Sequence, residues 1–193
     1  MAGRAPRIRR VGKPTGERKI MRRLALAIAS VPVAMTAVSA SAGATGYAPV
    51  HWGSGPKTVI TGSSGAVTDI RSGRHENFDR LVIDTHLADG GYYVRYTDEV
   101  TYVGSGEPVP LRGGAKLFVM AYSPSYDEDF DPTYEPADPA EVVDVTGYRT
   151  FRQVAWAGSW EGATDLGLGV RARLPFRVFT LPDRIVVDVA HQW

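Results

Sequence analysis

Residues 176–190 read FRVFTLPDRIVVDVA, and this stretch decides the class of fold. Its two halves, 176–181 and 185–190, are dense in β-branched and aromatic residues, which favour strands. The PDR tripeptide that separates them is typical of a tight turn. The stretch therefore predicts two antiparallel strands joined as a β-hairpin.

Four earlier segments show the same kind of pattern. They are residues 78–87, 92–98, 116–122 and 151–160, and further strand signals begin after Val67. The Asp89-Gly90-Gly91 turn signal predicts that the first two of these segments form another hairpin. One short helix is conceivable at residues 160–167, although two glycines argue against it. We therefore predict an all-β fold, a two-sheet β-sandwich of short, mostly antiparallel strands.

Residues 123–147 interrupt this strand pattern. The segment carries eight acids and four prolines, and proline cannot pair within a continuous sheet, so we predict a long acidic loop. Asp127, Asp129 and Asp131 match the first acidic positions of a calcium-binding loop. Pro132 stands where such a loop needs glycine, so a solvated loop is the favoured interpretation and calcium the weaker alternative.

The N-terminal part of the chain has the composition of an export signal. The first 23 residues hold nine basic side chains and one acid, and residues 24–38 are uncharged and mostly apolar. A run of small residues follows at 39–44. This order predicts a basic region and secretory signal peptide over residues 1–42. A retained membrane anchor is the weaker alternative, because the apolar run is shorter than the roughly 20 residues of a membrane span.

The sequence leaves the details of processing open. Cleavage after Ala40, Ala42 or Ala44 fits the small-residue rule equally well. Translation starts at Met1 or at Met21, and the export route is undetermined.

The rest of the chain excludes several functional classes. It holds 13 of the 22 basic and 20 of the 21 acidic residues, a net charge of −7, which disfavours nucleic acid as a partner. There are no cysteines, so disulfide scaffolds, thiolate metal sites and thiol nucleophiles are excluded. Residues 43–66 are rich in small residues and proline and are predicted as a flexible linker, followed by one β domain at 67–193.

No catalytic pattern stands out. The glycine-serine motifs lack the G-x-S-x-G spacing of a nucleophile elbow, and His75-Glu76 lacks a second histidine at helical spacing. We therefore predict no enzyme activity and no cofactor. A hydrolase with a dispersed carboxylate or histidine site is the least favoured alternative.

An arginine-rich segment offers binding residues instead. Arg71, Arg74 and Arg80 are candidates for contacting an anionic polymer, because guanidinium groups donate paired hydrogen bonds to carboxylates and phosphates. The alternative is surface ion pairing of Arg74 and Arg80 with Glu76 and Asp79.

Three further side chains are singled out by their context. Asp188 lies in an apolar strand, and we predict that it accepts hydrogen bonds from an arginine such as Arg177 or Arg184. Tyr93 and Trp160 are predicted as exposed aromatic side chains that contact the ligand.

The closing motif PFRVFTLPDRIVVDV at 175–189 resembles that of the AMIN family. The opening DIRSGRHENFDRLV at 69–82 and the segment GYYVRY at 91–96 resemble the AMIN-like domain of secreted proteins of high-GC Gram-positive bacteria. The resemblance covers roughly residues 67–191. It implies two packed sheets, binding of peptidoglycan or a related wall polymer, and no catalysis.

We therefore expect a secreted, non-catalytic cell-envelope module whose partner is a cell-wall glycan or an envelope protein. No nucleic acid partner is expected, and the membrane is contacted only through an uncleaved signal segment. The alternative is a secreted protein-binding or inhibitory β-sandwich that uses the acidic loop.

Overall fold

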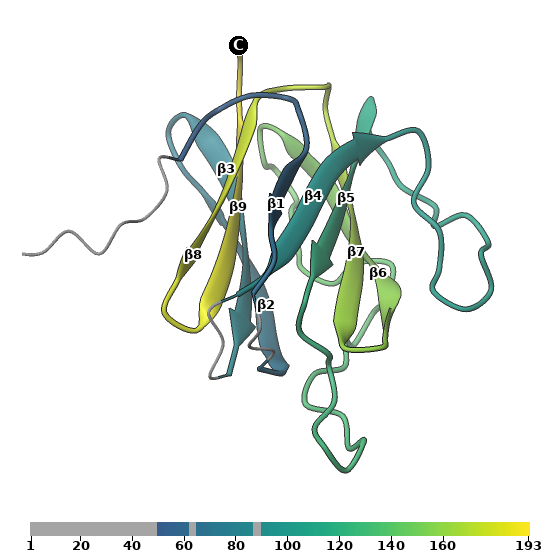
Figure 1. Cartoon of the computed structure of the whole chain (residues 1–193). Coiled ribbons are helices and arrows are strands. Elements are labelled where there is room, and N and C mark those ends of the chain that lie inside the picture. The colour runs from purple at the N-terminus through teal and green to yellow at the C-terminus, as the bar shows by residue number, and fades with distance from the viewer. Residues whose placement is uncertain (1–49, 62–64, 87–89) are drawn as a thin grey trace, which may run out of the picture. The chain divides into compact units, whose positions relative to one another are not determined.

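The computed structural model describes residues 50–61, 65–86 and 90–193. The signal peptide predicted for residues 1–42 lies outside this range. The described residues form nine strands and no helix, so no helix there is long and apolar enough to cross a membrane (Figure 1). The strands are β1 (Lys57–Val59), β2 (Val67–Arg74), β3 (Phe78–Thr85), β4 (Tyr92–Thr97), β5 (Ala115–Ala121), β6 (Phe151–Trp160), β7 (Ala163–Val170), β8 (Phe176–Leu181) and β9 (Arg184–Ala190).

The strands form two antiparallel sheets that face each other (Figure 1). The four-stranded sheet has the order β2-β3-β9-β8, and the five-stranded sheet has the order β1-β4-β5-β7-β6. This confirms the predicted all-β sandwich. The C-terminal hairpin of β8 and β9 is confirmed as well, and Asp183 takes a φ of 59° in its turn.

The core fills the space between the sheets. Alternation along each strand points one set of apolar side chains inward, as the period of two requires. Those of β5, β7 and β9 are the most numerous. The largest fully buried side chains include Leu81, Ile83, Leu117, Phe151, Leu166, Leu168, Phe176 and Ile185.

The predicted hairpin of residues 78–98 is wrong. β3 belongs to the four-stranded sheet and β4 to the five-stranded sheet. Both edges of β3 are already occupied, by β2 and by β9, so its backbone has no free edge for β4. The chain therefore crosses from one sheet to the other between these strands.

β7 is a strand where the sequence suggested at most a short helix. Glu161 and Gly162 both have positive φ, 49° and 81°, which suits the tight turn of a two-residue hairpin. This turn joins β6 to β7, so residues 163–170 run antiparallel to β6.

Glycines hid the strand pattern of β7. On its outer side, a Cβ built at Gly167 would lie 2.7 Å from the Leu111 side chain, and one at Gly169 would lie 2.0 Å from the Arg112 carbonyl oxygen. The loop 98–114 packs here against the outer face of the sheet. The close approach of this backbone requires glycine where an exposed strand would carry larger residues.

Part of the predicted linker is built into the sandwich. β1 pairs with β4, and Gly53 exchanges two backbone hydrogen bonds with Phe176. The linker prediction is therefore wrong for residues 50–61, whose polar composition concealed an edge strand. Residues 65 and 66, also within the predicted linker, lead directly into β2.

Residues 123–147 form a loop without any named strand, as predicted, and it extends beyond the strand ends (Figure 1). Its second half is anchored. Val145 is buried in the core, and Gln153 of β6 donates a hydrogen bond to the Ala140 carbonyl at 2.9 Å. The loop is therefore part of the fold from about residue 139 onward.

Candidate functional site

The outer face of the four-stranded sheet gathers charged side chains in cross-strand rows. Arg80 of β3 and Arg177 of β8 both stand opposite Asp188 of the central strand β9. Another row places Asp84 of β3 opposite Arg184. We call this surface the arginine face, and it comprises Arg71, Arg80, Asp84, Arg177, Arg184 and Asp188.

Asp188 is the centre of the arginine face. Its side chain is 0% exposed, while those of Arg80 and Arg177 are 25% exposed. Arg80 donates from Nε to Oδ1 at 2.6 Å and from Nη2 to Oδ2 at 2.9 Å, and Arg177 donates from Nε to Oδ2 at 2.7 Å. The hydrogen bonds to Asp188 raise the pKa of the Arg80 guanidinium, which therefore stays charged. The predicted bond between Arg177 and Asp188 is present.

Aromatic rings frame the two guanidinium groups. The Arg80 Cζ lies 5.1 Å from the Phe78 ring and 5.5 Å from the Phe179 ring. The Arg177 Cζ lies 4.6 Å from the Trp52 ring and the same 5.1 and 5.5 Å from those two rings. Cation–π contacts at these distances hold the guanidinium planes in place.

This arrangement leaves hydrogen-bond donors available. Within the described residues, Nη1 and Nη2 of Arg177 and Nη1 of Arg80 have no hydrogen-bond partner. Two arginines share one carboxylate, so the centre carries a net charge of +1. It presents cationic donors beside apolar rings, a combination that suits a ligand with both an anionic group and a flat apolar surface.

A second, more exposed ion pair completes the face. Arg71 donates to Asp84 from Nε at 2.5 Å and from Nη2 at 2.9 Å, and Arg184 lies 3.8 Å from the same carboxylate. The side chains of Arg71 and Asp84 are 47% and 20% exposed. Arg71 therefore points to solvent.

Arg74 does not share this face. It stands three residues after Arg71 in β2, so alternation turns it to the other side, where it donates to the Gly147 carbonyl at 3.2 Å. The alternative pairing with Glu76 and Asp79 is wrong. Asp79 is fully buried and accepts hydrogen bonds from the Thr150 and Phe151 backbone instead.

The two predicted aromatic residues lie on the five-stranded sheet. Tyr93 is on its outer side, 6.4 Å from the Phe118 ring, and Trp160 ends β6 with 65% exposure. Neither adjoins the arginine face. The aromatic frame of Trp52, Phe78 and Phe179 was not predicted from the sequence. The sequence did hold one signal for it. Phe78 is two residues from Arg80, and Phe179 is two residues from Arg177, so each ring lies on the same side of its strand as the arginine.

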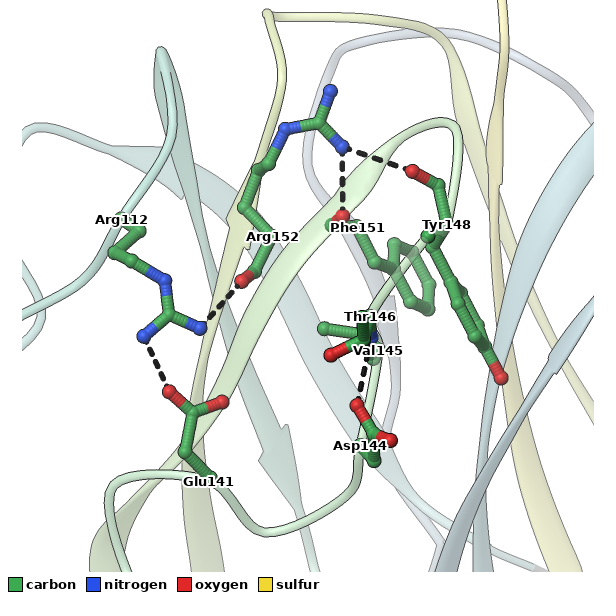
Figure 2. A pocket seen from close by; sticks show the side chains of 9 residues that line it. Arg112, Glu141, Asp144, Val145, Thr146, Tyr148, Phe151 and Arg152 are labelled. Carbon is green, nitrogen blue, oxygen red and sulfur yellow. Dashed lines mark hydrogen bonds and ion pairs between the residues drawn. The ribbon is translucent and has the colours of Figure 1, made fainter.

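The hollow in Figure 2, about 320 Å³, holds two carboxylates, those of Glu141 and Asp144. Glu141 forms an ion pair with Arg112, whose Nη2 also donates to the Arg152 carbonyl. Hydrogen bonds from Thr146 lower the pKa of Asp144. The lowered pKa makes Asp144 a poor proton donor near neutral pH.

Asp127, Asp129 and Asp131, the calcium candidates, are not arranged as metal ligands. Asp127 Oδ1 accepts hydrogen bonds from the backbone of Asp129 and Asp131, at 3.0 and 2.9 Å. In the part of the chain that the structure describes, no group of three or more acidic or histidine side chains is arranged to hold a metal ion. The three acids belong to a capped turn.

Comparison with known families decides the assignment. The model of the AMIN-like domain matches residues 65–191. The chain belongs to the AMIN-like domain family. No curated protein and no solved structure matches it. AMIN-like domains are associated with the cell envelope and are typically non-catalytic binding modules.

The arginine face lies wholly inside the range matched by the AMIN-like domain. The rings of Phe78 and Phe179 beside it also come from that range, whereas Trp52 precedes it. The bridge between Gly53 and Phe176 brings Trp52 over Arg177. The segment before the family domain thus completes the aromatic frame.

Proposed function

We propose that this AMIN-like protein is a secreted, non-catalytic module that binds peptidoglycan or a related anionic wall polymer through the arginine face. The observation that carries the proposal is the pair of guanidinium groups held by buried Asp188 between three aromatic rings. Their spare N–H groups suit a carboxylate of the polymer, and the ring of Trp52 suits stacking against a sugar.

Preorganisation supports the proposal. Arg80 and Arg177 have already lost side-chain freedom to Asp188 and to the rings, so a ligand has little additional ordering to impose. Trp52 is 41% exposed and therefore still offers surface for contact. The site needs no movement of the sheet.

Retention on purified sacculi tests the function. We expect Trp52→Ala and Arg71→Gln each to weaken retention, and the effect of Arg71→Gln to fade as salt screens its charge. The matched controls are Trp193→Ala, which removes a 77% exposed tryptophan elsewhere, and Arg149→Gln, which removes an exposed cation. No retention of the unaltered protein at low salt would overturn the proposal.

The predicted residues away from the arginine face are tested alongside. Trp160→Ala and Arg74→Gln remove them one at a time. If these variants lose retention while Trp52→Ala keeps it, the binding surface belongs to the other side of the molecule.

A second candidate function is capture of a protein partner by the acidic loop. Phe130 is 77% exposed and takes a φ of 64°, a strained backbone conformation for a bulky residue, and it stacks on Tyr126 at 5.6 Å. Both rings line a groove of about 300 Å³ together with Tyr134 and Trp156. Acidic side chains surround an apolar anchor, which suits a basic partner.

The test of this candidate uses a point variant, because the loop contributes to the core and its deletion would unfold the domain. Phe130→Ser should abolish capture of a basic protein partner from culture medium and leave sacculus retention unchanged. Equal capture by both forms would remove the candidate.

A further inference from the structure

A second cationic site lies at the ends of β4 and β5. A hollow of about 570 Å³ opens there, between the strand ends and the turn at 171–175. Three cations line it, Arg95, Lys116 and Arg173, together with one acid, Asp98. We call it the basic hollow. None of its cations belongs to the arginine face.

The charges of the basic hollow are not neutralised. Among the described residues, no ion pair within 4.0 Å involves Arg95, Lys116 or Arg173. With Asp98 counted, the net charge of the hollow is +2. A cavity that focuses charge of one sign attracts an oppositely charged ligand.

Arg173 is held in position before any ligand arrives. The Tyr96 hydroxyl donates to the Leu174 carbonyl at 2.7 Å and accepts from the Leu174 N–H at 2.9 Å, which ties the turn to β4. The Arg173 Cζ then lies 4.7 Å from the Tyr96 ring, and its Nη2 donates to the Ser54 carbonyl at 3.2 Å.

Arg95 is positioned in a similar way on the outer side of the sheet. Its Cζ lies 5.6 Å from the Phe118 ring and 6.0 Å from the Tyr93 ring. Lys116 is the cross-strand partner of Thr97, so it is a diagonal neighbour of Arg95 on the outer side of the sheet. Two stacked guanidinium groups and one flexible ammonium group thus line the hollow.

We propose that the basic hollow binds a phosphate group carried by a small polyol or sugar. One guanidinium fork satisfies a flat carboxylate, whereas a tetrahedral phosphate has oxygens left for a second cation of the hollow such as Lys116. A net charge of +2 matches a phosphate dianion. The volume lies within the usual range of small-molecule sites, so the hollow also has room for the carrier.

Titration calorimetry of the purified protein with glycerol 1-phosphate tests the proposal. We expect saturable binding to one site that weakens as salt is added. Lys116→Gln and Arg173→Gln should each weaken it about tenfold or more, as expected for the loss of a charge-assisted contact. Arg149→Gln removes an exposed cation outside the hollow and should leave binding unchanged.

Two variants keep the test decisive. If Arg173→Gln disturbs the turn and lowers the melting temperature, Lys116→Gln alone decides, because the side chain of Lys116 makes no hydrogen bond or ion pair with the described residues, whereas its backbone pairs within the sheet. A titration whose heats of injection do not saturate would overturn the proposal. Equal affinity of the Lys116→Gln variant and the unaltered protein for glycerol 1-phosphate would overturn it as well. Equal binding of malonate would overturn the preference for phosphate.

The source of the phosphate is a separate arm of the experiment. Inorganic phosphate that competes as well as glycerol 1-phosphate would show that the phosphate group alone is recognised, which supports the proposal. Arg71→Gln, which should weaken sacculus retention, should leave glycerol 1-phosphate binding unchanged. The proposal for the arginine face and the proposal for the basic hollow can therefore be refuted independently of each other.

Discussion

Replacement of Asp188 by asparagine is the sharpest test of the arginine face. The carboxylate is fully buried and accepts three hydrogen bonds from two guanidinium groups. Asparagine keeps the shape but loses the charge, and its amide N–H₂ turns a donor toward donors. Breaking a buried ion pair from one side costs about 3–5 kcal/mol.

We expect the lower end of that range, about 3 kcal/mol, because Arg80 and Arg177 keep 25% exposure and can recover some hydration. For a domain of this size that loss lowers the melting temperature by about 10 °C. Urea unfolding at pH 7, followed by tryptophan fluorescence, measures the change in free energy directly.

Asp84→Asn is the matched control, since Asp84 serves the more exposed pair with Arg71. An exposed pair of this kind contributes at most about 1 kcal/mol. If Asp188→Asn costs no more than Asp84→Asn, burial of the ion pair is not what stabilises this face. The joint replacement Arg80→Met, Arg177→Met and Asp188→Leu should restore most of the stability, because it leaves no uncompensated charge.

Two other predictions concern the opposite sheet. Burial raises the pKa of Asp165 to about 6, above its ordinary 3.8, so the folded protein holds the proton more tightly and loses stability as the pH rises from 4 to 6. Asp165→Asn should therefore stabilise by about 1 kcal/mol more at pH 7.5 than at pH 4, measured as unfolding free energy; an equal gain at both pH values would contradict this. Gly169→Ala places a Cβ against the Arg112 carbonyl and should cost about 3 kcal/mol or more, whereas Gly55→Ala meets open space and should be neutral within about 0.5 kcal/mol in the same assay. Equal stability of the two alanine variants would mean that the loop does not lie on β7.

The strands of a hairpin and the contacts between their facing side chains could be predicted from local sequence. Period-two alternation and a turn signal predict the β8–β9 hairpin, and residues of a hairpin are cross-strand neighbours. The sequence alone therefore predicted an arginine partner for Asp188, either Arg177 or Arg184, and the structure shows that of these two the partner is Arg177.

The alternation of side chains along a strand was not enough to predict the whole site. It tells which side of a strand a residue faces but not which element covers that side. Tyr93 and Trp160 are on the outer side or at the end of their strands, yet on the sheet opposite the arginine face. Membership of a sheet follows from strand order, which depends on contacts far apart in sequence.

The sequence by itself determined the all-β class, the last hairpin and the acidic loop, because each depends on residues close together in the chain. Only the tertiary structure decided that Arg80 reaches Asp188, 108 residues away, and that Trp52 lies over Arg177. It also decided that β3 and β4 part into different sheets. The physical reason is that every strand offers two equivalent edges, and which neighbour takes each edge is settled by burial of the whole core rather than by any local pattern.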